Sequence, residues 1–65
     1  MLTLDTKVSL TCVENDHVAP GTIVRIQGNR VDVALDQGGL LVSLYMKKAG
    51  LYVGSQSGLE FVMRI

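Results

Sequence analysis

Residues 21–36 read GTIVRIQGNRVDVALD and predict a β-hairpin that turns at Gly28 and Asn29. Glycine at the first central position suits a type II′ turn, whose twist matches that of the strands it joins. Counting outward from the turn gives the register of the hairpin. The predicted cross-strand pairs are Gln27–Arg30, Ile26–Val31, Arg25–Asp32, Val24–Val33, Ile23–Ala34 and Thr22–Leu35.

This register divides the hairpin into an apolar face and a polar face. The apolar face carries five large aliphatic residues: Val24, Ile26, Val31, Val33 and Leu35. Ile23 is the one large apolar residue on the opposite face, where Arg25 and Asp32 are expected to form a solvated surface ion pair. A shift of one residue would place charges on the apolar face, so the pattern specifies the register well.

The remaining chain consists of further strand patterns separated by turn residues. Residues 1–13 alternate apolar and polar side chains and are long enough to bend near Asp5 and Thr6. Residues 40–46 (LLVSLYM) fit a strand or a helix, and their short length between glycines favours the strand. Residues 51–53 and 59–65 are predicted strands, and residues 54–58 (GSQSG) are a predicted flexible loop.

Five or six short strands without a clear helix predict a single all-β domain over residues 1–65. We expect a small antiparallel barrel or a strongly bent sheet. The expected interior residues are Leu4, Val8, Leu10, Val24, Ile26, Val31, Val33, Leu35, Val42, Leu44, Leu59, Phe61 and Met63.

Size and composition limit the functions open to this domain. The chain has 65 residues, 48% of them hydrophobic, and a formal net charge of zero. A domain of this size buries only about 60% of the surface of its unfolded chain. The single cysteine allows no internal disulfide. We therefore expect part of the apolar surface to contact a partner, either a second copy in a homodimer or a larger protein.

Charge and hydropathy argue against two broad classes. A neutral chain is unlike a general nucleic-acid-binding protein, in which lysine and arginine cluster. The opening residues MLTLDTK lack the basic region and apolar core of a signal peptide, and no apolar run is long enough to span a membrane. We expect a cytoplasmic protein that does not associate with membranes.

The polar loop after the first predicted strand contains side chains that could bind a metal or take part in catalysis: Cys12, Glu14, Asp16 and His17. Their spacing matches no known metal site. Cys12 lies on the apolar face and fits a small core residue, and His17 has no nucleophile beside it in the sequence. The glycines lack the strand-then-helix context of a phosphate loop. The sequence therefore predicts no catalytic, metal or cofactor site, and no enzyme.

Two sets of outer-face residues are candidates for binding. The apolar set, for self-association or docking on a larger protein, is Ile23, Leu41, Tyr45, Tyr52 and Val62. The basic set, for anions or nucleic acid, is Arg25, Arg30, Lys47, Lys48 and Arg64. In the second case Tyr45 and Tyr52 would stack on bases. We expect a non-enzymatic interaction module, with nucleic-acid binding as the alternative.

The stretch GTIVRIQGNRVDVAL, with a second half ending in GLEFVMRI, is similar to the core of PilZ domains, the barrels that bind cyclic-di-GMP. The similarity covers roughly residues 7–63 and includes a closing Gly-x-x-Phe strand at residues 58–61. It implies a small barrel of the PilZ-like or SH3-like kind.

The binding signature of that family is not matched here. Lys7 stands where its N-terminal arginine motif is expected. In its Asp-x-Ser-x-x-Gly turn, Arg25, Gln27 and Arg30 replace the three fixed residues. Recognition of cyclic-di-GMP requires several guanidinium groups, so the resemblance implies a relative that no longer binds the nucleotide.

The first eight residues, MLTLDTKV, also resemble the MLxLxxKV strand of RNA-binding proteins of the carbon-storage-regulator type. This resemblance covers residues 1–8 and a similar hairpin, and the basic C-terminal strand of that family is absent. Binding of RNA or of a cyclic dinucleotide is therefore the alternative to an interaction module.

Overall fold

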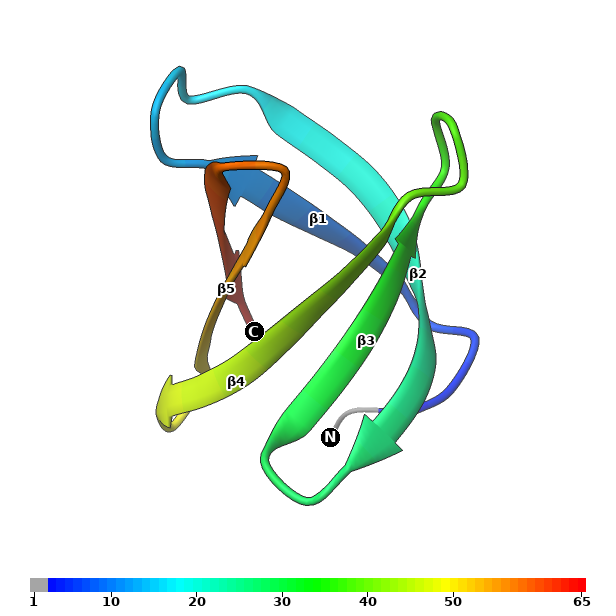
Figure 1. The fold of residues 1–65 in the computed structure, drawn as a ribbon. Coiled ribbons are helices and arrows are strands. Elements are labelled where there is room, and N and C mark those ends of the chain that lie inside the picture. The colour runs from blue at the N-terminus through cyan, green and yellow to red at the C-terminus, as the bar shows by residue number, and fades with distance from the viewer. Residues whose placement is uncertain (1–2) are drawn as a thin grey trace.

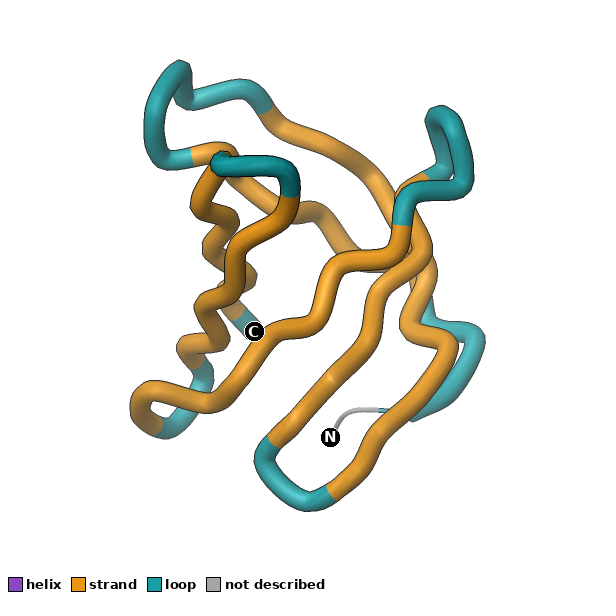
Figure 2. Tube along the Cα trace, viewed as in Figure 1, coloured by secondary structure: helices purple, strands orange, loops and turns teal. Residues whose placement is uncertain are grey.

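The computed structural model describes residues 3–65, which form six strands and no helix (Figure 1, Figure 2). The strands are β1 (Lys7–Cys12), β2 (Val18–Gln27), β3 (Arg30–Leu35), β4 (Leu41–Lys48), β5 (Leu51–Gln56) and β6 (Leu59–Arg64). Each strand pairs antiparallel with the next, and β6 pairs with β1, so the sheet closes into a barrel. The predicted all-β antiparallel barrel is confirmed, and the LLVSLYM segment is a strand.

The core of the barrel consists of side chains that alternate inward along the strands. The buried apolar residues are Leu10, Cys12, Ile23, Val31, Val33, Leu35, Val42, Leu44, Phe61 and Met63. Val8, Ala19 and Tyr52 are partly buried and pack against this cluster. Most of the predicted interior is therefore correct, and Cys12 is a small core residue as predicted.

The hairpin forms between β2 and β3 and turns at Gly28 and Asn29. Gly28 has a φ of 59°, the positive value that the first central position of a type II′ turn requires. The three pairs nearest to the turn are those predicted from the sequence. Farther from the turn, a β-bulge between Ile23 and Arg25 shifts the register by one residue. The pairs there are Ile23–Val33, Thr22–Ala34 and Gly21–Leu35.

The bulge reverses the predicted orientations of Ile23 and Val24. Val24 is the additional residue in β2, so it lies outside the ladder and is 45% exposed. Ile23 pairs with Val33 and is fully buried in the core. The assignment of Ile23 to an exposed interface is therefore wrong, as is the assignment of Val24 to the interior.

Three more predicted interior residues are exposed because of their positions at the ends of strands. Strand β1 begins at Lys7, because Asp5 has a φ of 64° that ends the extended backbone, and Leu4 lies outside the barrel. Residues 1 and 2 of the predicted first strand lie outside the described residues. Ile26 and Leu59 sit beside the turns at either end of the barrel, where few side chains cover them.

The predicted flexible loop at residues 54–58 is mostly strand. Gly54 belongs to β5 and lies opposite Leu44 and Phe61. A Cβ atom on Gly54 would collide with the carbonyl oxygen of Ser43, so glycine is needed for the close approach of β4. The turn itself is only Ser57 and Gly58, whose φ values of 55° and 79° are those of a type I′ turn.

Alanine substitutions test the bulge in β2. Ile23→Ala should lower the free energy of unfolding by about 2–5 kcal/mol, because it leaves a cavity in the core. Val24→Ala removes an exposed side chain and should lower it by less than about 1 kcal/mol. Urea denaturation of the two variants beside the unmodified protein measures both effects. Equal losses, or a larger loss for Val24→Ala, would contradict the shifted register.

Candidate interaction site

A row of cross-strand neighbours runs around the outside of the barrel from β3 to β1. Arg30 lies opposite Tyr45, Tyr45 opposite Val53, Val53 opposite Val62, and Val62 opposite Thr11. These side chains point outward because the residues alternating with them face the core. Tyr45 is 53% exposed, and Val53 and Val62 are half-buried. The row therefore has an apolar centre with polar residues at both ends.

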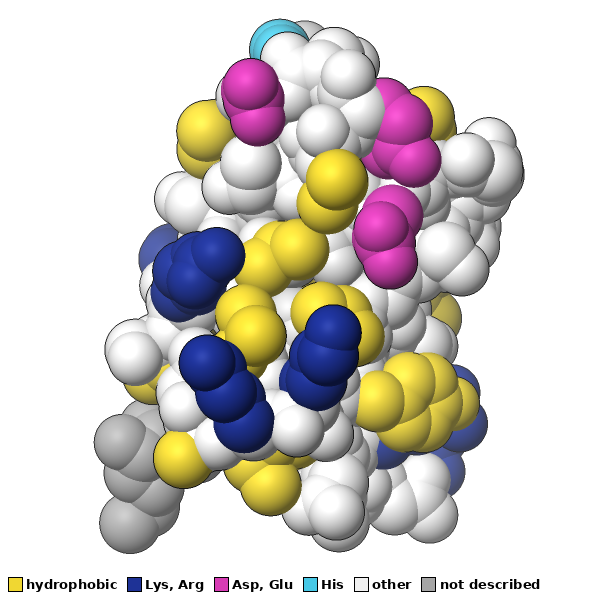
Figure 3. Space-filling view, turned by 90° about the vertical axis from the view of Figure 1, so that its left-hand side faces the viewer, with side chains coloured by type: hydrophobic (Ala, Val, Ile, Leu, Met, Phe, Trp, Pro, Cys, Tyr) yellow, Lys and Arg dark blue, Asp and Glu magenta, His cyan; other side chains and the backbone are white. Residues whose placement is uncertain are grey.

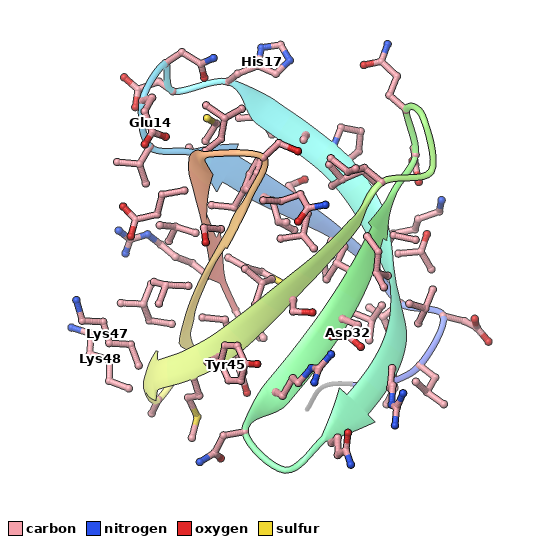
Figure 4. The ribbon with its side chains drawn as sticks, viewed as in Figure 1. Glu14, His17, Asp32, Tyr45, Lys47 and Lys48 are labelled. Atoms are coloured by element: carbon pink, nitrogen blue, oxygen red, sulfur yellow. The ribbon has the colours of Figure 1, made fainter. Side chains whose placement is uncertain are left out.

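Three cations lie next to this row, and none of them forms an ion pair with a described residue. Leu51 lies between two of them, opposite Lys48 on β4 and Arg64 on β6. Lys47 is the additional residue of a second irregularity in β4, between Met46 and Lys48. Figure 4 shows the side chains of Lys47 and Lys48 extending away from the barrel. The positive charges on this side are thus available to bind a partner of opposite charge.

This outer surface of β4, β5 and β6 is termed the basic face, and it comprises Tyr45, Lys47, Lys48, Leu51, Val53, Val62 and Arg64. Figure 3 shows this side of the barrel, with lysine and arginine side chains around apolar ones in its lower half. Carboxylates lie toward the upper end, where the loop between β1 and β2 carries Glu14 and Asp16 and Glu60 is the second residue of β6. Positive and negative side chains are therefore separated along this side of the barrel, although the chain has no net charge.

The barrel brings together only part of the predicted basic set. Lys47, Lys48 and Arg64 share the basic face, and Arg30 borders it beside Tyr45. Arg25 lies on β2, on the far side of β3 from that face. The five predicted anion contacts therefore do not form one surface.

The predicted apolar set is also divided. Tyr45 and Val62 are on the basic face, and Leu41 is exposed on the same side of β4, nearer to its start. Tyr52 packs against the core, so one of the two predicted stacking tyrosines faces inward. Leu51 and Val53 of the basic face were missed. Their alternation with Tyr52 was the signal that the two aliphatic residues and the tyrosine point in opposite directions.

Asp32 is a buried carboxylate on the outer side of β3, only 3% exposed. It lies between Arg25 on β2 and Ser43 on β4. Its Oδ1 accepts a hydrogen bond of 3.1 Å from the Nε of Arg30, and Nη2 of Arg30 donates to the Ser43 hydroxyl at 3.4 Å. The predicted solvated pair of Arg25 with Asp32 is therefore wrong, because Arg30 is the ion-pair partner and the carboxylate is covered.

The surroundings of Asp32 favour its charged form. Burial raises the pKa of Asp32, but hydrogen bonds from Ser43 and Arg30 and the positive charges of Arg30 and Arg25 outweigh burial. The pKa of Asp32 consequently lies below its ordinary value. The same contacts hold Arg30 in place at the border of the basic face.

Asp32→Asn tests this arrangement through its pH dependence. Because the pKa is depressed in the folded state, the carboxylate stabilises the fold above its unfolded-state pKa. That contribution is lost as the pH falls through the folded-state pKa. Asp32→Asn should therefore be less stable than the unmodified protein at neutral pH, and the difference should shrink in acid.

Urea denaturation from neutral to acidic pH measures this difference. Asp36→Asn is the matched control, because it removes only the exposed pair that Asp36 forms with Lys7 at 3.3 Å. A loss of stability in Asp32→Asn that stays the same at every pH would contradict the proposed role of the charge.

A cavity of about 200 Å³ opens at the upper end of the barrel, with Cys12, Leu35 and Phe61 among its lining residues. The Cys12 thiol donates to Glu14 Oε1 at 3.6 Å, and the same oxygen accepts the backbone N–H of Glu60 at 3.0 Å. The hydrogen bond from the Glu60 backbone lowers the pKa of Glu14. Ligand pockets usually measure about 300–1,000 Å³, so this cavity is smaller than a typical ligand site.

The loop residues that could serve chemistry are not assembled into a reactive group. The backbone N–H of His17 donates a hydrogen bond to Asn15 Oδ1 at 2.8 Å. The side chain of His17 lies apart from that of Glu14 (Figure 4). Within residues 3–65, no three histidine, cysteine, aspartate or glutamate side chains lie together as metal ligands would. Among the described residues, the basic face is therefore the surface best suited to binding a partner.

Comparison with family models, with curated proteins and with solved structures gives no match to this chain. The resemblances to PilZ domains and to carbon-storage regulators therefore stay predictions. In residues 3–65 no helix has the length and apolar character needed to cross a membrane.

Proposed function

We propose that this protein is a small non-enzymatic interaction module that binds an acidic protein partner through its basic face. The observation that supports this function is the group of three cations, free of ion pairs with described residues, around the apolar centre of Tyr45 and Val53. Protein interfaces commonly combine an apolar or aromatic centre with a polar rim. Charge complementarity of the rim then selects an acidic partner.

A larger acidic partner fits this face better than a second copy of the chain. A two-fold dimer brings the same surface of each subunit to the interface. A two-fold axis through the basic face would bring Lys47, Lys48 and Arg64 against the same three cations of the second copy, with no carboxylate of that face to balance them. The carboxylates that this side shows lie nearer to its other end (Figure 3).

Single-stranded nucleic acid is the second candidate, because phosphates would also match the three cations. Binding of this kind relies on several aromatic side chains that stack on successive bases. The basic face offers Tyr45 alone, since Tyr52 packs against the core. The acidic protein partner is therefore the better supported of the two.

Removal of the two lysines tests the proposal. The probe is a fluorescent peptide in which glutamate alternates with valine, and fluorescence anisotropy measures its affinity. Lys47→Gln combined with Lys48→Gln should weaken binding by about two- to thirtyfold, because each exposed charge pair contributes about 0.2–1 kcal/mol. Arg25→Gln is the control, because Arg25 is a cation on β2, on the far side of β3 from the basic face. It should leave the affinity unchanged.

Two results would contradict this function. One is a peptide affinity that is the same for the double variant and the unmodified protein, or the same when lysine replaces glutamate in the peptide. The other is tighter binding of an oligothymidylate than of the acidic peptide, which would assign the face to nucleic acid.

A further inference from the structure

Strands β1 and β6 close the barrel with the shortest register of any neighbouring pair. Their ladder contains only Thr11–Val62 and Cys12–Phe61, and beyond it the Val13 N–H donates to the Glu60 carbonyl oxygen at 2.8 Å. In contrast, β5 and β6 pair from Leu51–Arg64 through to the turn. Residues 7–9 of β1 have no partner in β6 among the described residues. The barrel therefore has an open seam along the first half of β1 and the end of β6.

The backbone hydrogen bonds show which groups face this seam. In an antiparallel ladder, residues that bond to one neighbour alternate with residues that bond to the other. Thr6 and Cys12 bond on the β2 side, at 2.9 and 2.8 Å, so the even-numbered residues of β1 face β2. Lys7, Ser9 and Thr11 then direct their N–H and C=O groups toward β6. Thr11 meets β6 there, but Lys7 and Ser9 do not.

The facing edge of β6 is open in the same way. Ile65 donates its N–H to the carbonyl oxygen of Gly50 at 2.9 Å, so the odd-numbered residues of β6 face β5. Arg64 directs its N–H and C=O toward β1, where the register has already ended. An exposed row of such groups is a template for an added strand.

A groove of about 310 Å³ runs along the outside of β1 and β6, from the loop after β1, across the paired Thr11 and Val62, to the seam at Ser9 and Arg64. Its lining residues are Ser9, Thr11, Val13, Asp16, Val62 and Arg64. Val62 and Arg64 also belong to the basic face, so the groove and that face form one continuous surface. Asp16 at one end and Arg64 at the other give the groove a negative and a positive end.

We propose that the partner enters this groove as an extended segment and adds a strand to β1, with an acidic side chain beside Arg64. This inference rests on the proposed function and specifies its mode of binding. The main chain of the segment bonds to Lys7 and Ser9, and side chains of the segment contact Val62. Repulsion from Asp16 orients the segment, because the acidic side chain must lie at the Arg64 end of the groove, away from Asp16.

Backbone methylation of the peptide tests strand addition without altering the protein. Two versions of the alternating glutamate–valine peptide carry N-methyl groups, one on the glutamates and one on the valines. Alternate residues of a strand face opposite neighbours, so one version loses its hydrogen bonds to β1 and the other keeps them. The two affinities should differ by about two- to tenfold for each hydrogen bond lost.

Hydrogen exchange of the labelled full chain locates the added strand. The amide of Ser9 should exchange more slowly when the unmethylated peptide is bound, whereas the amide of Gln37, in the loop between β3 and β4, should not change. Arg64→Gln should weaken the peptide with glutamate but not the same peptide with glutamine at those positions.

The outcomes distinguish strand addition in the groove from binding of an acidic partner by the basic face. Equal affinities of the two methylated peptides, with unchanged exchange at Ser9, would overturn strand addition. If the lysine variants still weakened binding in that case, the basic face would remain the surface that binds the acidic partner. Slow exchange at Ser9 without peptide, together with a dimer in sedimentation, would show that a second copy occupies the seam and would overturn the acidic segment as its occupant.

Discussion

The β-bulge in β2 is the constraint on which the rest of this barrel depends. Strand β2 pairs with β1 through Val18–Thr22 and with β3 through Gly21–Gln27, so it must bend where it leaves one neighbour for the other. The additional residue, Val24, lies directly after that point. A bulge bends its strand and increases the local twist, which is what closing a small sheet requires. It also turns Ile23 into the core against Val33.

A second irregularity of the same kind helps to form the basic face. In β4 the register shifts between Met46 and Lys48, and Lys47 is the residue without a partner. A regular strand would have directed one of two consecutive lysines inward. Here both lysines extend away from the barrel at the end of β4, as Figure 4 shows. The geometry that closes the barrel therefore also concentrates charge on one side of it, and a chain with no net charge acquires a surface with a definite sign.

Local chemistry in the sequence was sufficient to predict the hairpin, its turn and the all-β class. Gly28 and the alternation of residues on either side of it carry that information within a few positions. An inserted residue does not disturb alternation on either side of itself, so the bulge was not predicted. Its one trace in the sequence was Ile23, a large aliphatic residue on an otherwise polar face.

The features of the candidate site that escaped prediction depend on contacts between distant parts of the chain. Arg30 pairs with Asp32 because residues two apart share a face of the strand, and the crowding from β2 and β4 that buries the carboxylate has no local signature. Gly54 resembles a loop glycine until β4 is placed against it. The open seam between β1 and β6 depends on the pairing of two strands from opposite ends of the chain, which neither strand encodes by itself.

The register on the far side of the bulge can be measured directly by cross-strand nuclear Overhauser effects between backbone protons in solution. The structure predicts strong contacts between Ile23 and Val33 and between Thr22 and Ala34. A regular hairpin would instead give contacts between Ile23 and Ala34 and between Thr22 and Leu35. That second pattern would show that β2 has no bulge and that Ile23 faces outward, and it would contradict this account of how the barrel closes.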